Sequence, residues 1–315
     1  MLTLFATPKP FHGHIGVIQR NAIASWLRLD PGVEVILFGE QEGTAGVCRE
    51  FGCRHEPSVA HNEFGTPLLG DFFGRAQQIA RHPWMVYSNC DIILMQDYVR
   101  AYRRCQQWRD QFLLVGRRWD LDITEPLDFS PPDWEQQLAV CARRDGRQRT
   151  AEWIDYLAFP RGMVRDIPAF AVGRPVWDNY FLWSIGAEGI PVVDATPAVT
   201  AVHQNHDYAH HPQGQLGVWQ GEEFRRNFAL SGGRRHHHTV EDATWHLTET
   251  GVVPNRLAWL APSLRAVRRL ANRVRTTGRV YIKHPLLNLT RPLRHRIGRI
   301  AGRAQGGELR KEKES

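Results

Sequence analysis

Over the first 115 residues, short apolar runs alternate with segments of helical periodicity, and this alternation limits the fold more than any other feature. Runs that fit buried strands cover residues 2–6, 33–38, 53–55, 84–88 and 112–116. Segments with apolar residues at helical spacing cover residues 15–27, 45–51, 68–80 and 97–108. Repeated strand–helix units predict an α/β fold with a mostly parallel central sheet and helices on both faces. Ligands of such sheets bind beyond the carboxyl ends of the strands.

The chain is less regular after residue 116. Residues 119–149 are rich in charge, Trp and Pro, which indicates an insertion or lid over the sheet, with a helix near residues 134–142. Further strands are expected at residues 153–160, 191–194 and 198–202, and further helices at 176–187 and 242–248. We therefore expect one domain over residues 1–250, followed by a basic helical tail over residues 251–315 that is partly disordered at its end.

Charge is distributed unevenly along the chain. Residues 262–315 carry 15 Lys and Arg against 3 Asp and Glu, or +12, whereas residues 1–261 carry 25 against 30, or −5. A mildly acidic body argues against nucleic acid as the partner of the whole chain. In the tail, apolar residues at helical spacing lie between arginines, a pattern that fits an anionic membrane surface. An acidic protein partner or a solubilising end fits the same charges.

The sequence contains neither a run of about 18–20 apolar residues that would span a bilayer nor a signal-peptide pattern at its start. The five cysteines are scattered and form no Cys-x-x-Cys pair, which favours reduced thiols over a disulfide framework or a zinc knuckle. We therefore expect a cytoplasmic protein that associates peripherally with the inner face of the membrane through its tail.

Three polar residues at element ends are candidates for chemistry. Asp91 follows the strand at residues 84–88, Asp178 opens the helix at 176–187, and His203 follows the strand at 198–202. Asp is also a common helix cap or turn residue, and a histidine at a strand end is often a hydrogen-bonded core residue. The residues alone leave both interpretations open.

In this order, the three residues resemble the metal and catalytic motifs of glycosyltransferases with the GT-A fold. Asn89-Cys90-Asp91 stands where these enzymes have Asp-x-Asp, and residues 173–179 resemble their Gly-containing segment with a Trp and an acidic residue at a helix start. The resemblance covers roughly residues 1–210. It implies a nucleotide-binding half over residues 1–115 and an acceptor and catalytic half over 116–250.

The resemblance also implies a mechanism. Asp91 and His203 would hold Mn²⁺ or Mg²⁺, which would stabilise the nucleoside diphosphate as it leaves the sugar. Asp178 would remove the proton of the acceptor hydroxyl in an inverting transfer. Asn89 replaces the first Asp of the motif, and its amide can still hydrogen-bond to the ribose.

The donor is expected to be a nucleoside-diphosphate sugar, UDP- or GDP-linked, and the acceptor a glycan, a lipid-linked molecule or a small molecule. Donor-binding residues are expected at the exits of the early strands and in the turn before the helix at 68–80, namely Thr7, Pro8, Lys9, Glu40, Asn62, Thr66 and Leu69 together with Asn89 and Asp91. Carboxylates, aromatic rings and amides further on are expected to contact the sugar or the acceptor, namely Arg117, Trp119, Asp120, Asp122, Asp155, Trp177 and Asn179.

Four alternatives remain open at this point. His12-Gly13-His14-Ile15-Gly16 after the first strand is compatible with an NAD- or S-adenosylmethionine-dependent Rossmann enzyme, although the full G-x-G-x-x-G spacing is missing. The segment from His203 to His211 holds ligand types for a zinc or iron hydrolase. The third and fourth alternatives are a sugar-1-phosphate nucleotidyltransferase and a non-catalytic binding protein.

Overall fold

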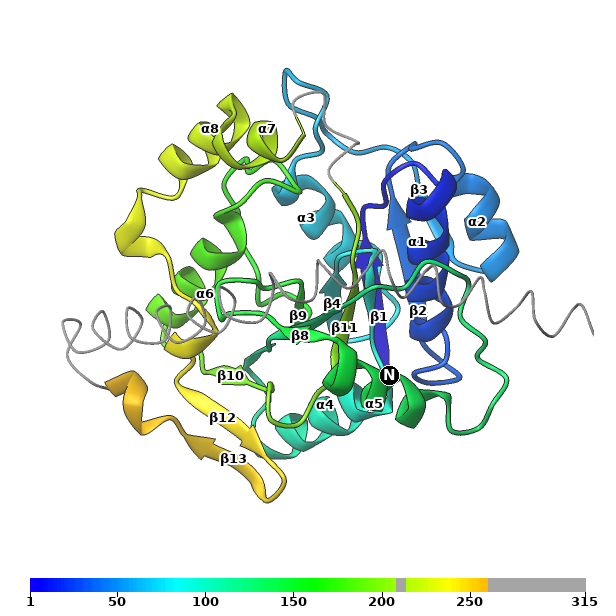
Figure 1. Ribbon diagram of the computed structural model, residues 1–315. Helices are drawn as coiled ribbons and strands as arrows, with labels where there is room; N and C mark the ends of the chain where they lie inside the picture. The colour runs from blue at the N-terminus through cyan, green and yellow to red at the C-terminus, as the bar shows by residue number, and fades with distance from the viewer. Residues whose placement is uncertain (208–213, 260–315) are drawn as a thin grey trace, which may run out of the picture. The chain divides into compact units, whose positions relative to one another are not determined.

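The computed structural model describes residues 1–207 and 214–259, all of which belong to one compact unit, Met1–Trp259. Its main sheet has, within these residues, nine strands in the order β13-β12-β10-β6-β9-β4-β1-β2-β3 (Figure 1). Their bounds are Leu2–Ala6 for β1, Glu34–Phe38 for β2, Arg54–Glu56 for β3, Trp84–Ser88 for β4, Leu113–Val115 for β6, Tyr156–Pro160 for β9, Val192–Asp194 for β10, Trp245–Thr248 for β12 and Gly251–Pro254 for β13. Only β9 and β13 run antiparallel to their neighbours among these strands, so the predicted mostly parallel sheet is confirmed.

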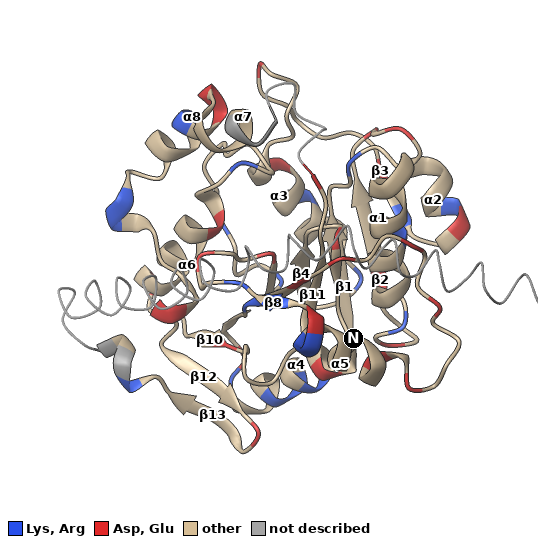
Figure 2. Ribbon diagram, in the orientation of Figure 1, with Lys and Arg blue, Asp and Glu red and all other residues tan. Residues whose placement is uncertain are grey.

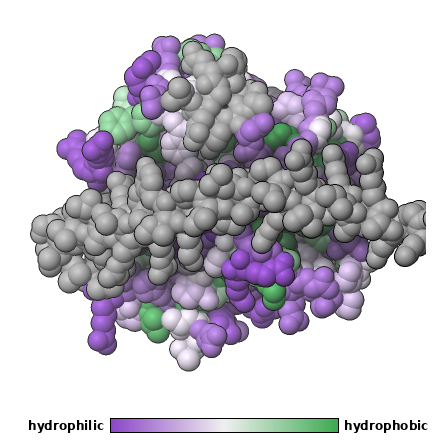
Figure 3. All heavy atoms as spheres, in the orientation of Figure 1, coloured by the Kyte–Doolittle hydropathy of each residue, from purple (hydrophilic) through white to green (hydrophobic). Residues whose placement is uncertain are grey.

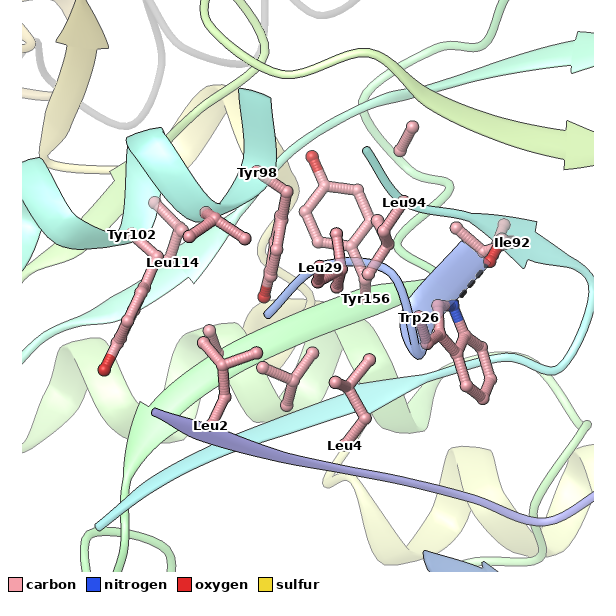
Figure 4. Close-up of a cluster of buried hydrophobic side chains, with 14 of the residues drawn as sticks. Leu2, Leu4, Trp26, Leu29, Ile92, Leu94, Tyr98, Tyr102, Leu114 and Tyr156 are labelled. Atoms are coloured by element: carbon pink, nitrogen blue, oxygen red, sulfur yellow. Dashed lines mark hydrogen bonds between the residues drawn. The ribbon is translucent and has the colours of Figure 1, made fainter. Parts of the chain in front are cut away.

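Helices cover both faces of this sheet because its strand residues alternate between two apolar cores. Leu4 faces a core that contains residues of α1 (Gly13–Trp26), α2 (Thr44–Phe51) and α4 (Gln96–Trp108) (Figure 4). Its neighbour Phe5 faces a core with residues of α3 (Leu69–Ile79) and α6 (Trp177–Ala187). Burial of each large apolar side chain contributes about 1.5–3 kcal/mol, so the two cores hold the central strands firmly between helices.

A second, four-stranded sheet lies in the order β5-β11-β7-β8. Its strands are β5 (Ile92–Ile93), β7 (Arg118–Leu121), β8 (Arg147–Gln148) and β11 (Ala201–Gln204). One face packs against helix α5 (Trp134–Asp145) through a small apolar cluster that includes Ile93, Leu121, Leu138 and Val202. The predicted helix near 134–142 is therefore present, but residues 119–149 belong largely to this sheet and its covering helix.

Two predicted elements differ from the structure. The strand expected at residues 198–202 lies at Ala201–Gln204, where it pairs with β5 and β7. The helix expected at residues 242–248 is wrong: a 3-10 turn at Val240–Asp242 is followed by β12. Pairing of β12 with β10 and β13 places Leu247 in the core, and these long-range contacts outweigh the local helical pattern.

The predicted start of the tail, at residue 251, falls within the compact unit Met1–Trp259. Residues 251–259 form β13 and a 3-10 turn at Arg256–Trp259, because Val252 and its neighbours pair with β12. The expected helix and disordered end between residues 260 and 315 lie outside the described residues.

Charged residues avoid the centre of the sheet. Strands β1, β4, β6 and β9 carry none, whereas the helices and loops carry many (Figure 2). Where the described surface is visible in Figure 3, most of it is hydrophilic. No described helix has both the length and the apolar character needed to cross a bilayer. Helices α7 (Gly214–Gln220) and α8 (Glu222–Leu230) and a 3-10 turn at Arg234–His236 complete the described elements.

Candidate functional site

Polar side chains from three parts of the chain meet beyond the carboxyl ends of β1 and β4. Asp91 follows β4, Lys9 follows β1, and His203 and His206 come from β11 and the loop after it. Gln19 of α1 holds the Lys9 backbone, since it accepts from the Lys9 N–H at 2.6 Å and donates to the Lys9 carbonyl at 2.8 Å. The segment after β1 is thereby fixed beside the end of β4.

Asp91, His203 and His206 form a cluster with the geometry of a metal site. The Asp91 Oδ2 atom lies 3.2 Å from His206 Nε2 and 3.8 Å from His203 Nε2, and one ligand atom from each residue lies within 4.8 Å of the others. All three side chains are largely buried, with at most 13% exposed. The second oxygen of Asp91, Oδ1, is buried and accepts no hydrogen bond from the described residues. A buried carboxylate with one unpaired oxygen, whose other oxygen faces two imidazoles, fits a divalent cation.

The charges around Asp91 favour its ionised form. Burial opposes ionisation, but His203, His206 and Lys9 together lower the pKa of this carboxyl below its ordinary value. Lys9 Nζ lies 3.2 Å from His206 Nε2, and burial lowers the pKa of this ammonium group. The Lys9 side chain therefore ends directly beside the cluster of Asp91, His203 and His206.

A network of ion pairs supports the cluster from behind. Arg118 Nε donates to Asp120 Oδ1 at 3.0 Å, and Arg118 Nη1 lies 2.5 Å from Asp155 Oδ1. Asp155 Oδ1 also accepts a 2.8 Å hydrogen bond from the Asn89 amide. Burial alone would raise the pKa of Asp120, but His203, Arg118 and Arg149 lower it by more, so that its pKa lies below the ordinary value. The structure thus brings Asn89, Asp120 and Asp155 together as three members of a single buried network.

Asp178 lies at the start of α6, and its Oδ1 accepts a hydrogen bond from the Asn179 N–H at 2.9 Å. Burial, with the negative charge of Asp155 nearby, raises the pKa of Asp178 to about 7. A carboxyl group with a pKa near neutrality can accept a proton at physiological pH and is still a stronger base than an ordinary Asp.

The structure uses several other predicted site residues for packing or folding. Trp177 is 6% exposed in the core and packs against Phe73 and Tyr87, and Leu69 is fully buried. The Asn179 amide donates to the His238 carbonyl at 2.9 Å. These contacts hold α6 and its first turn in place.

The turn at residues 62–66 is tied to α8. Asn62 Oδ1 accepts from the backbone N–H groups of Phe64 and Thr66, and its amide donates to Glu223 Oε1 at 2.8 Å. A hydrogen bond from the Thr66 side chain helps to lower the pKa of Glu223. Asn62 and Thr66 thus lie in a structured turn, and no contact links this turn to Asp91 among the described residues.

The remaining predicted residues lie around the rims of the two sheets. Arg117 Nε donates to the Arg149 carbonyl at 2.6 Å, and Asp122 accepts from the Asn205 amide at 2.8 Å. Trp119 lines a cleft of about 690 Å³ together with residues of α4 and α5. Glu40 is exposed, Pro8 is buried and Thr7 is partly buried.

Three residues of the candidate site were not predicted from the sequence. His206 was seen only as part of a histidine-rich segment, although its spacing of three residues from His203 was a usable signal. Gln19 and Arg149 had no local signal, because their partners lie far away in the sequence.

No protein family profile and no curated protein matches this chain. Among solved structures, it is similar to glucosyl-3-phosphoglycerate synthase from Mycobacterium tuberculosis with Mn²⁺, UDP and phosphoglyceric acid, at 14% identity over 74% of this chain and 79% of that one, with a TM-score of 0.45. It is also similar to TarS from S. aureus, at 9% identity over 73% of this chain and 38% of that one, with a TM-score of 0.46. A third similar structure is that of a protein from Desulfovibrio desulfuricans G20 described as a nucleotide-diphospho-sugar transferase, at 9% identity over 73% of this chain and 96% of that one, with a TM-score of 0.41.

These likenesses lie at low identity, so the function has to be argued from the side chains of the site.

Proposed function

We propose that this chain is a metal-dependent glycosyltransferase that moves a sugar from a UDP-linked donor to an acceptor hydroxyl. The single observation that carries the proposal is the cluster of Asp91, His203 and His206, with an unpaired buried oxygen on Asp91, at the carboxyl edge of a mostly parallel sheet. Bound there, Mn²⁺ or Mg²⁺ would neutralise the diphosphate as it leaves.

Lys9 and Asp178 would carry the remaining chemistry. The Lys9 ammonium group, beside the metal ligands, would contact a diphosphate oxygen, where a second positive charge stabilises the leaving group. Asp178 would accept the proton of the acceptor hydroxyl while the oxygen of that hydroxyl bonds to the sugar carbon. The bond from that carbon to the diphosphate breaks, and its electron pair leaves with the diphosphate. Direct attack of this kind inverts the configuration at the sugar carbon.

A donor screen tests the proposal. The melting temperature of the protein should rise with one of the UDP-, GDP- or dTDP-sugars in the presence of Mn²⁺, and the rise should be lost in EDTA, because a ligand that binds only the folded state stabilises it. A hexosyl donor on UDP is expected to give the largest shift. No shift with any of these donors in Mn²⁺ would contradict the proposal.

A second candidate rests on His206. Two imidazoles and one carboxylate also form the ligand set of iron and zinc enzymes, so a metal hydrolase fits the same cluster. Metal analysis separates the two functions: a hydrolase would be isolated with stoichiometric zinc or iron, whereas a glycosyltransferase of this type would exchange Mn²⁺ and Mg²⁺ readily.

The two halves of the chain and its tail extend the proposal. Residues 1–115 would bind the nucleotide, and residues 116–250 the acceptor, which could be a glycan, a lipid-linked molecule or a small molecule. Residues 262–315, with a charge of +12, would hold the enzyme at an anionic cytoplasmic membrane face. Deletion of these residues should release the protein from anionic vesicles; equal sedimentation of the full and truncated chains would overturn the membrane role.

A further inference from the structure

His203 has a charged partner on the side of its ring that faces away from Asp91. Strands β11 and β7 are parallel, and their register places His203 directly opposite Asp120. The Nδ1 atom of His203 lies 3.2 Å from Asp120 Oδ1, an ion-pair distance at which the ring orientation does not yet form a hydrogen bond, while Nε2 of the same ring faces Asp91. Both residues are less than 9% exposed.

Two arginines hold Asp120 in this position. Arg118 Nε donates to its Oδ1 at 3.0 Å, and Arg149 Nε lies 2.5 Å from its Oδ2. The Trp153 ring lies close to both guanidinium groups, at 4.9 Å from that of Arg118 and 4.5 Å from that of Arg149. Asp120 therefore cannot easily rotate away from His203, and the two positive charges keep it ionised.

An ionised carboxylate only accepts hydrogen bonds. A neutral imidazole carries one N–H, so Asp120 draws that proton to Nδ1 of His203 and leaves the lone pair on Nε2, the atom that faces Asp91. His206 is held differently, because its Nδ1 lies 2.6 Å from the backbone carbonyl of Asp207. A side-chain substitution can therefore remove the partner of His203 and leave that of His206 in place.

We infer that Asp120 is a positioning residue that selects the metal-binding tautomer and orientation of His203, and that Arg118 and Arg149 hold Asp120 for this task. The inference rests on the proposed metal-dependent function. Partners of metal-ligating histidines typically contribute about 10–100-fold to metal affinity. Asp120 thus acts on the metal through His203 and touches neither the metal nor the substrate.

The test is the Asp120→Asn variant. The carboxamide is neutral and has one oxygen. If this oxygen keeps the Arg118 hydrogen bond at the Oδ1 position, His203 loses the negative charge that favours Nδ1–H; if it turns to Arg149 instead, the NH₂ group faces His203 and forces the proton to Nε2. Nitrogen-15 NMR of the metal-free proteins should show an Nδ1–H tautomer for His203 in the wild type and a larger Nε2–H fraction in the variant. Calorimetric titration with Mn²⁺ should show an affinity lower by about 10–100-fold.

Asp194 provides a matched control. It is also buried, it lies opposite His246 in a parallel strand pair, and its Oδ2 is 3.3 Å from His246 Nδ1, yet it is not part of the metal cluster. Asp194→Asn should leave the Mn²⁺ affinity unchanged. The inference is overturned if Asp120→Asn keeps the wild-type tautomer, or if it lowers the melting temperature while the Mn²⁺ affinity stays the same. Because the NMR measurement needs no metal, it decides on Asp120 even if the wild type fails to bind Mn²⁺, a result that would count against the proposed function instead.

Discussion

The two faces of the four-stranded sheet are built from the same strands, but one face is charged and the other is apolar. On one face, Arg118, Asp120 and His203 form a buried network of charges beside Asp91. On the other face, the intervening residues Trp119, Leu121 and Val202 join the apolar cluster under α5. Alternation along each strand therefore puts a candidate chemical site and a small apolar core back to back. Substitutions on the two faces should have separable effects on function and on stability.

The largest effect is expected beside the charged face, at Asp178. Asp178→Asn should lower turnover by roughly 10²–10⁴-fold, the usual contribution of a positioned general base, with the affinity for the donor little changed. The amide keeps an oxygen that can accept from the Asn179 N–H, so the helix start should persist. A fall of melting temperature with turnover preserved would show instead that Asp178 only stabilises the first turn of α6, a contribution of about 0.3–1 kcal/mol.

The next effect concerns the metal ligands themselves. Asp91→Asn and His206→Ala should each weaken Mn²⁺ binding beyond the roughly 10–100-fold expected for an outer partner, because each removes a ligand of the cluster. Calorimetry measures this directly, with His246→Ala as a control imidazole outside the cluster. Retention of Mn²⁺ affinity in His206→Ala would reduce the site to Asp91 and His203.

On the apolar face, substitutions should lower the stability of the fold and leave the Mn²⁺ affinity unchanged. Leu138 of α5 is 8% exposed in the small apolar cluster, so Leu138→Ala should lower the free energy of unfolding by about 2–5 kcal/mol. Denaturation in urea measures this loss. Mn²⁺ affinity in the folded protein should equal that of the wild type, and a parallel loss of affinity would show that the two faces are coupled.

The last expected effect is a pH dependence of stability. The pKa of Asp178 rises from its ordinary value of 3.8 to about 7 on folding. Between these pH values the folded protein holds a proton that the unfolded chain has released, so stability should fall as pH rises through this window. Asp178→Asn has no such proton. Its unfolding free energy should therefore decrease less than that of the wild type between pH 4 and pH 8, and identical decreases would contradict the raised pKa.

Strands β1 and β4, which precede Lys9 and Asp91, could be predicted from the sequence because they are mostly apolar runs followed by polar residues. The four-stranded sheet could not, since strands such as Arg118–Leu121 and Arg147–Gln148 are short, polar and stabilised by partners far away in the chain. Trp177 is expected at the sugar or the acceptor because residues 173–179 resemble the glycosyltransferase segment that has a Trp and an acidic residue at a helix start. Its burial follows from α6 being covered on several sides, which local spacing does not reveal.

The candidate site is assembled from positions that are distant in the sequence, and this has a consequence for how the protein is made. Asp91 and His206 are 115 residues apart, and Lys9 and His206 are 197 apart. Contacts of such long range form late, because the chain must first close large loops, and synthesis proceeds from the N-terminus at roughly 5–20 residues per second. For some seconds the growing chain on the ribosome therefore contains Lys9 and Asp91 without either imidazole. A metal ion held by Asp91, His203 and His206 could therefore bind only after β11 and the loop that follows it have been made.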